Sequence, residues 1–374
     1  MLAVGLLALV LLIAFAERYV YETYADGQLV VSLAFSPDRG PRGEVTELLV
    51  RVEHVGRLPI PWVTVYIHLP MDLTCPAAQG QSLMGRMAVP YRGGIVRHYP
   101  VTPLRRGMYR IERLRVEFSD PLGLYVRRLD AFATAELLAH PHPRPAALTA
   151  PTRALLGTIE RPSLLEDPTA TRGVRPWRPD DPLRRVHWPQ TARTGEFMAR
   201  EYATAVDAHL YLVANLATHV PHWSSVDHDR LEGVIEVSAG MAMEACRLAM
   251  PVGLAVNGVA FEATPITRLL PGASPGHLAR FLDTLARLSS YPSASPEALF
   301  RVAAATPPEA TLVFITSPIP ESWRTVLPTL SRRRPVVLTV LAAPEDAVVA
   351  PTGVRVVRLP LLTSEPSPNE AVAP

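Results

Sequence analysis

The sequence predicts an all-β domain followed by a doubly wound α/β domain, with a hydrophobic helix at the N-terminus. Three observations lead to this fold class. Short runs of alternating or β-branched residues, separated by Gly, Pro and Asp turns, fill the first part of the chain. Apolar strands then alternate with amphipathic helices, which is the pattern of a parallel sheet covered by helices. The first sixteen residues carry no charge.

The N-terminal run from Met1 to Ala16 would form about 24 Å of helix, slightly less than the roughly 30 Å of a bilayer core. Tyr19 and Tyr21 could extend it into the interface, where tyrosines are favoured. We therefore expect residues 1–22 to be a single membrane anchor. The position of Arg18 behind it indicates that the domains that follow are cytoplasmic. A signal peptide ending near Ala16 and a start site further upstream are the alternatives.

The all-β domain is expected over residues 28–139. Its strands are predicted at Leu29–Phe35, Val45–Val55, Trp62–Leu69, Ile95–Val101, Tyr109–Phe118 and Leu124–Leu137. Regular short strands with turn signals between them are typical of a β-sandwich. Residues 140–171 hold six prolines, so we interpret them as a linker.

The α/β domain is expected over residues 205–360. Its strands are predicted at Leu210–Ala214, Val252–Val256, Leu312–Thr316 and Val336–Leu341. Asp227 and Asp229 are candidate N-caps of the helix after the first strand, and Ser274-Pro275 and Ser295-Pro296 are the start signals of two further helices. A fourth helix is expected around Trp323–Ser331. Residues 361–374 form a polar, proline-rich tail, which predicts disorder.

Composition excludes several classes of protein. The 374 residues include 37 basic and 35 acidic side chains, and every basic one is arginine. Without lysine there can be no P-loop, no Schiff base and no protein-kinase site. The net charge of +2 is too small to favour nucleic-acid binding. Cys75 and Cys246 lie far apart and lack a CxxC pattern, so neither a disulfide framework nor that kind of zinc site is expected.

The densest local signal lies in residues 172–204. Seven arginines fall between Arg172 and Arg200, with two tryptophans among them. Asp181 followed by proline predicts the start of a short helix over Leu183–Trp188, and Gly195 allows the chain to reverse into an extended segment over Glu196–Tyr202. Arginine and tryptophan at these spacings can form planar ion pairs and stacked contacts.

This segment resembles the signature of the DUF58 family, approximately R-x-[YW]-x-P-G-D-x-x-R-x-[IV]-x-W-x-x-[ST]-A-R-x-G followed by Arg-Glu. The one departure is Asp180, where the family usually has glycine. Upstream, Arg105-Arg106-Gly107-Met-Tyr109 and Asp120-Pro121-Leu122-Gly123-Leu124 resemble two further family stretches. Family members often carry two hydrophobic N-terminal segments, whereas this chain shows one. The matching signature positions that we single out are Arg175, Trp177, Pro179, Asp181, Arg184, Trp188, Arg193, Gly195, Arg200 and Glu201.

The resemblance implies that the C-terminal domain is similar to a von Willebrand factor A (vWA) domain. Such domains often bind a divalent metal through D-x-S-x-S after the first strand. In this chain the corresponding positions are Asn215, Ala217 and His219, so the anionic ligand and both serines are missing. Losing the carboxylate removes most of the attraction for a hard cation. We therefore expect a degenerate site with no metal, and no other cofactor.

Three interpretations of the Arg/Trp segment are open: an intramolecular clasp between parts of the chain, a surface that binds a partner, or a phosphate or catalytic site. The resemblance implies MoxR-type AAA+ ATPases and transglutaminase-like membrane proteins as partners. Our leading hypothesis is thus a membrane-anchored, non-enzymatic interaction or assembly factor that binds no nucleic acid. The alternatives are a hydrolase that uses Asp181, His187 and Arg193, and a nucleic-acid binder that uses the arginines.

Overall fold

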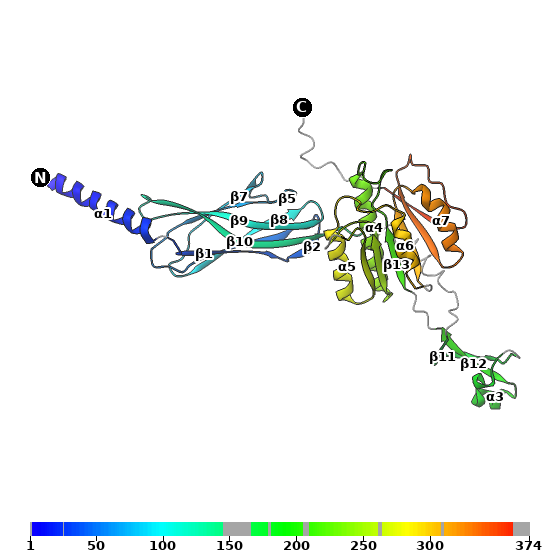
Figure 1. Cartoon of the computed structure of the whole chain (residues 1–374). Coiled ribbons are helices and arrows are strands. Elements are labelled where there is room, and N and C mark those ends of the chain that lie inside the picture. The colour runs from blue at the N-terminus through cyan, green and yellow to red at the C-terminus, as the bar shows by residue number, and fades with distance from the viewer. Residues whose placement is uncertain are drawn as a thin grey trace. The chain divides into compact units, whose positions relative to one another are not determined.

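The computed structural model describes residues 2–24, 26–144, 166–178, 181–204, 209–260, 264–307 and 310–361. The chain divides into two compact units. The first contains residues 1–142 and 282–288, and the second contains residues 143–281 and 289–374. Strands dominate the first unit, whereas strands and helices alternate in the second (Figure 1). The predicted combination of an all-β part and an α/β part is therefore confirmed.

Two sheets enclose the core of the first unit. The smaller sheet has the order β1 (Leu29–Ser36), β3 (Thr46–His54), β8 (Gly94–Pro103), β5 (Leu73–Thr74). The larger sheet has the order β2 (Arg39–Pro41), β10 (Val126–His140), β9 (Gly107–Ser119), β4 (Val63–His68), β7 (Ser82–Met87), β6 (Ala78–Gln79). Buried side chains alternate with half-buried or exposed ones along β3 and β4, as expected for strands with one face on a core. Val50 and Val65 from the two sheets belong to one buried cluster.

Helix α1 (Leu2–Tyr24) corrects the prediction of a membrane anchor. No helix among the described residues has both the length and the apolar character needed to cross a bilayer, so the expected N-terminal anchor and membrane localisation are wrong. The physical reason lies in the second half of α1. Its uncharged part ends at Ala16, after which Glu17, Arg18 and Glu22 follow. Tyr21 is then buried at 3% exposure, and its ring lies 6.4 Å from the ring of Tyr125.

The second unit begins with a two-stranded antiparallel ribbon. Strand β11 (Glu166–Pro176) pairs with β12 (Met198–Thr204). Between them lie a 3₁₀ turn, η1 (Leu183–Arg185), and the short helix α3 (Trp188–Thr194). Residues 140–171 were predicted as a linker, but β10 extends to His140 and β11 starts at Glu166. Residues 145–165 of that prediction lie outside the described residues, and so does all of the predicted disordered tail, 361–374, except its first residue.

A six-stranded sheet forms the α/β part of the second unit. Its order is β15 (Thr267–Gly272), β14 (Val252–Val256), β13 (Leu210–Ala214), β16 (Thr311–Thr316), β17 (Val336–Ala342), β18 (Arg355–Pro360). All neighbouring pairs are parallel except β14 with β15. The order reverses at β13, because the chain first builds toward β15 and then returns to add β16 on the other side. Such a reversal is the point where doubly wound sheets place their ligand sites.

Helices cover the α/β sheet. Residues of α6 (Ala298–Ala304) and α7 (Glu321–Ser331), including Leu299 and Trp323, share one buried cluster with Phe314 and Leu338 of the sheet. Helix α4 (His228–Arg247) contacts β13, β14, β16 and β17 but contributes no residue to that cluster, so it covers the opposite face (Figure 1). Of the two candidate caps, Asp227 is the one that caps α4, by accepting the amide of Arg230 at 3.1 Å. Helix α5 spans Pro275–Arg287.

Candidate functional site

A buried polar network occupies the end of the sheet where the strand order reverses. Asn215 follows β13, Asn257 follows β14, and Thr316 is the last residue of β16, with at most 1% of each residue exposed. Asn215 Nδ2 donates to Thr316 Oγ1 at 2.9 Å, and Asn257 Nδ2 donates to Asn215 Oδ1 at 2.9 Å. The remaining groups bond to the main chain, since Asn257 Oδ1 accepts the amide of Leu216 at 2.7 Å. The network is therefore neutral and extensively bonded within the protein.

An arginine lies beside this network. Arg230, on the first turn of α4, donates through Nε to Asp227 at 3.1 Å and through Nη1 to Ser317 Oγ at 3.2 Å. Its Nη2 donates to Asp346 Oδ1 at 3.1 Å. The hydrogen bond from Arg230 is the main reason that the pKa of Asp346 is lowered. A protein cation thus neutralises the acidic groups that lie near the end of the sheet.

The residues of the predicted degenerate metal loop lie at the same end of the sheet. Asn215 and Ala217 are buried, and the Asn215 side chain is used in the polar network. His219 is exposed, and its Nδ1 lies 3.0 Å from Thr218 Oγ1. Asn215 Oδ1 accepts hydrogen bonds from Asn257 Nδ2 and the Ala217 amide, and Thr316 Oγ1 accepts one from Asn215 Nδ2. Because these oxygens are already bonded within the protein, the groups present do not fit a hard divalent cation. Among the described residues, no group of three His, Cys, Asp or Glu could hold a metal.

The loop between β13 and α4 exposes large apolar side chains beside the network. Val220 is 90% exposed and Trp223 is 75% exposed. The ring of His222 packs edge-on against Trp223, with 4.8 Å between the ring centroids. The loop turns back on itself through a hydrogen bond from Ser224 Oγ to the carbonyl of Pro221 at 2.8 Å. This loop therefore presents an indole to solvent beside the end of the sheet.

The Arg/Trp signature folds around one ion pair. Both terminal nitrogens of Arg175 donate to the two carboxylate oxygens of Asp181 at 2.6 Å, in a bidentate arrangement. Asp181 Oδ2 also accepts the amide of Arg178 at 2.9 Å. These bonds, led by the one from Arg175, lower the pKa of Asp181 to about 2. The pair closes the turn between β11 and η1.

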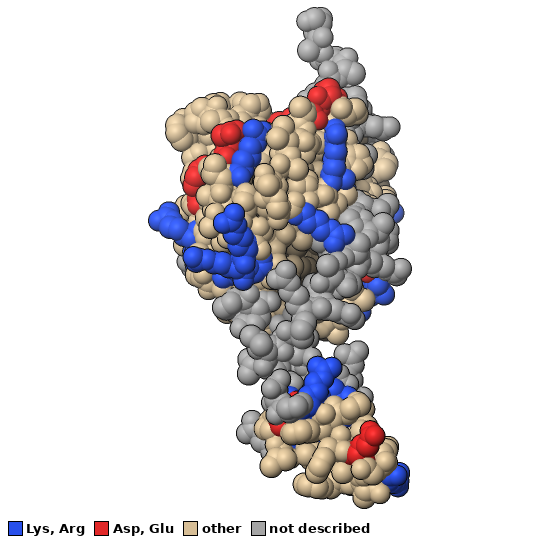
Figure 2. All heavy atoms as spheres, turned by 90° about the vertical axis from the view of Figure 1, so that its right-hand side faces the viewer, with Lys and Arg blue, Asp and Glu red and all other residues tan. Residues whose placement is uncertain are grey.

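Aromatic rings lie next to this turn. The ring of Phe197 lies 6.1 Å from that of Trp177 and 6.3 Å from that of Trp188, in tilted and edge-on arrangements. Trp188 is 61% exposed, Phe197 55% and the nearby Leu183 69%. Figure 2 shows the segment at the bottom of the view, where charged side chains surround a mainly uncharged surface. Exposed aromatic residues with arginines around them are typical of binding surfaces.

Helix α3 is held by its two ends. His187 is the N-cap, and its Nδ1 accepts the amide of Gln190 at 3.1 Å. Gly195 ends the helix with a left-handed φ of 76°, which reverses the chain as predicted. The predicted helix at Leu183–Trp188 is instead a 3₁₀ turn followed by α3. No described residue of α3 is buried, so the helix is positioned by its caps and by Thr191 Oγ1, which accepts the amide of Met198 at 3.0 Å.

The other signature residues take separate positions. Arg193 and Arg200 are exposed on α3 and β12. Arg184 and Glu201 belong to η1 and β12, but their side chains, like the whole of Pro179, lie outside what the structure describes. The two upstream stretches that resemble the family, residues 105–109 and 120–124, form parts of the first unit. Tyr109, in the first of them, is buried, and this burial raises its pKa to about 12.

A comparison with known protein families identifies the chain. The model of the family described as "Protein of unknown function DUF58" matches residues 173–360, which is half of the chain. The chain belongs to the DUF58 family. The matched range begins in the signature and ends with the last strand of the α/β sheet, so DUF58 comprises both features described above. The comparison with curated proteins found no match.

Solved structures similar to this DUF58 protein each cover about a third of it. A non-cellulosomal cohesin from Archaeoglobus fulgidus has 12% identity and a TM-score of 0.23, over 30% of this chain and 93% of its own. A CARDB domain from Pyrococcus furiosus, solved with di-metal ions, has 18% identity and a TM-score of 0.22, over 30% of this chain and 90% of its own. A PapD-like domain of human CEP192 has 13% identity and a TM-score of 0.21, over 30% of this chain and 86% of its own. TM-scores this low support no assignment of fold or function.

Sequence reasoning missed several residues of this site. Asn257 was overlooked although it follows the apolar strand Val252–Val256 in the same way that Asn215 follows Leu210–Ala214. That repeat was a usable signal. Arg230 and Asp346 lie 116 positions apart, and no pattern in the sequence connects them. Trp223 carried the signal of a tryptophan within a polar loop, which usually marks an exposed contact residue.

Proposed function

We propose that this DUF58 protein is a non-enzymatic interaction or assembly factor that works with a MoxR-type AAA+ ATPase through a metal-free, vWA-like α/β domain. The doubly wound order with one antiparallel edge strand is compatible with a vWA-like fold. The ATPase comes from the family resemblance, and a transglutaminase-like protein is a further candidate partner. Because the chain lacks the P-loop lysine, any ATP-driven step must take place in the partner.

One observation carries the proposal. At the reversal of the strand order, where related folds place a ligand, the polar groups are bonded to each other and the neighbouring loop exposes Trp223. Because the buried polar groups are hydrogen-bonded to each other, this end of the sheet has the character of a rigid support rather than of a reactive site. An exposed tryptophan on such a support has the character of a hot spot, because indoles dominate the binding energy of many interfaces.

The signature supports the same interpretation. Arg175 and Asp181 fix a turn that presents Trp188 and Phe197 to solvent, which is how a preorganised surface lowers the entropic cost of binding. The hydrolase alternative has less support. Asp181 is held by Arg175, and Nδ1 of His187 accepts a main-chain amide, so neither is arranged as a base next to a nucleophile.

The test is site-specific photocrosslinking. Amine-reactive reagents find no lysine side chain on this protein, so a photoreactive phenylalanine analogue is placed at position 223 of the full chain. The matched control carries the analogue at Trp62, which is 47% exposed on the all-β unit. We expect the MoxR-type ATPase of the same organism to crosslink to position 223 and not to position 62. Equal crosslinking at both positions, or none at either, would refute the proposal.

A further inference from the structure

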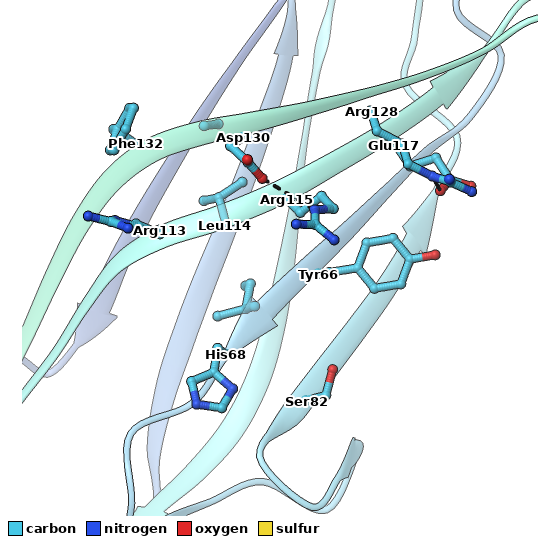
Figure 3. A pocket seen from close by; sticks show the side chains of 12 residues that line it. Tyr66, His68, Ser82, Arg113, Leu114, Arg115, Glu117, Arg128, Asp130 and Phe132 are labelled. Carbon is cyan, nitrogen blue, oxygen red and sulfur yellow. Dashed lines mark hydrogen bonds and ion pairs between the residues drawn. The ribbon is translucent and has the colours of Figure 1, made fainter.

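The larger sheet of the first unit has a hollow on its outer face. The hollow has a volume of about 690 Å³ and is formed by side chains of β4, β7, β9 and β10. Figure 3 shows the side chains of Tyr66, His68, Arg113, Arg115 and Phe132 gathered over these strands. All of these strands belong to one compact unit. The hollow is therefore a feature of the β-domain alone and does not depend on the function proposed above.

A β-bulge lies at one end of the hollow. The register between β9 and β10 shifts between Phe132 and Ala135, after Phe132 has paired with Arg113. A bulge bends its strand and increases the local twist, and such features often lie beside binding sites. The bend is visible in Figure 3, where β9 and β10 curve away below Phe132 and Arg113. Phe132 is 80% exposed there, which is unusual for a phenylalanine on a curved sheet.

The charges in the hollow are unequal. Arg115 Nε donates to Asp130 at 3.2 Å, and Arg128 Nε donates to Glu117 at 2.8 Å. These pairs are exposed, so each contributes little to stability and can rearrange around a ligand. Arg113 adds a third guanidinium at the end near Phe132. The lining therefore has three arginines against two carboxylates, which favours an anionic ligand.

We propose that this hollow binds an acidic, extended segment of a partner polypeptide. Arg113 would bind a carboxylate of the segment, because a guanidinium matches a carboxylate in two parallel hydrogen bonds. Phe132 and Tyr66 would pack against neighbouring aliphatic side chains. The hollow is open and its lining comes from four neighbouring strands, which suits an extended chain rather than a compact small molecule. Exposed Phe132 then supplies the apolar anchor, and the arginines supply the selection for acidic sequence.

The experiment measures binding of two labelled decapeptides to the full chain by fluorescence anisotropy. One peptide alternates Glu and Leu, and the other alternates Lys and Leu. We expect only the acidic peptide to bind. Arg113→Gln is expected to weaken that binding by about tenfold, because it removes a charge-assisted contact. Phe132→Ser is expected to weaken it by a similar factor. The control Arg97→Gln removes an exposed arginine from the smaller sheet and is expected to have no effect.

Three results would overturn the proposal. The first is an unchanged chain that does not bind the acidic peptide, or that binds both peptides equally. The second is an equal loss in Arg113→Gln and Arg97→Gln, which would indicate a general charge effect. The third is binding of heparin or polyphosphate that depends on Arg113 while the peptide does not bind, which would assign the hollow to another class of anion. Circular dichroism of each variant checks that the fold is retained.

Discussion

Asn215 Nδ2 donates a hydrogen bond to Thr316 Oγ1 at 2.9 Å and so joins the ends of two neighbouring strands, β13 and β16. In a doubly wound sheet these two ends flank the usual ligand position. Here both side chains are buried, and each is used by the other. The same end of the sheet is closed on its other side by Asn257. A neutral amide network therefore takes the place that a ligand would need.

This network predicts a large effect of removing Asn257. Asn257→Ala leaves the buried amide of Leu216 without its acceptor and Asn215 Oδ1 without one of its donors. We expect the free energy of unfolding of the full chain to fall by about 1–3 kcal/mol. Urea denaturation followed by tryptophan fluorescence measures it. The exposed substitution Thr325→Ala is the control, and an equal effect of the two would contradict the account of the network.

A second prediction concerns metal. Because the oxygens at this end of the sheet are already used, Mg²⁺ and Mn²⁺ at millimolar concentration, or EDTA, are expected to leave the melting temperature unchanged. A bound ion at about 100 times its Kd would add about 2.7 kcal/mol. That amount would shift the melting temperature by several degrees. Differential scanning fluorimetry measures the melting temperature at each ion concentration. A shift that saturates as the concentration of one ion rises would show that a metal site exists.

The Arg175–Asp181 pair predicts a pH dependence confined to low pH. The folded-state pKa of Asp181 is lowered from its ordinary value of 3.8 to about 2, mainly by the hydrogen bond from Arg175. A lowered pKa means that the pair stabilises the fold above the unfolded pKa and loses this effect as the pH falls from about 4 toward 2. We expect NMR titration of the Asp181 carboxyl carbon to give a midpoint near 2. In Arg175→Gln the midpoint is expected to rise toward 3.8, and a midpoint that does not move would contradict the bidentate pair.

The cap of α3 predicts a local effect at His187. Replacing it with alanine removes the acceptor of the Gln190 amide, which costs about 0.5–2 kcal/mol at a helix N-cap. Hydrogen exchange at Gln190 is therefore expected to accelerate by several-fold in His187→Ala. His187→Asn, which supplies another cap acceptor, is expected to restore protection. If both variants exchange at the same rate as the unchanged chain, the histidine does not have this structural role.

The strands and helices of the α/β part could largely be predicted from sequence. Leu210–Ala214 and Val252–Val256 were located at their observed ends, because continuous apolar runs bounded by polar residues mark buried parallel strands. The strand Thr267–Gly272 was missed, since it lies at the sheet edge, is only partly buried and ends in Pro-Gly. The strand Arg355–Pro360 was missed for a similar reason, because its charged residues break the apolar run.

The site was less predictable than the fold. The signature gave the ion pair partners Arg175 and Asp181 as candidates, since they lie close in sequence and their chemistry matches. The cation beside Asn215 was not predictable, because Arg230 reaches Ser317 and Asp346 only after the strands are placed. The N-terminal helix was misjudged because Tyr21, which the sequence analysis assigned to a membrane interface, packs into the first unit instead.

The central claim is tested most directly by the affinity of the full chain for the purified MoxR-type ATPase. Binding is measured by biolayer interferometry for the unchanged chain, for Trp223→Ala and for the control Trp62→Ala. The account predicts measurable binding that Trp223→Ala weakens by about thirtyfold, the effect of losing a hot-spot residue, and that Trp62→Ala leaves unchanged. Undetectable binding of the unchanged chain, or equal affinities of the two variants, would contradict it.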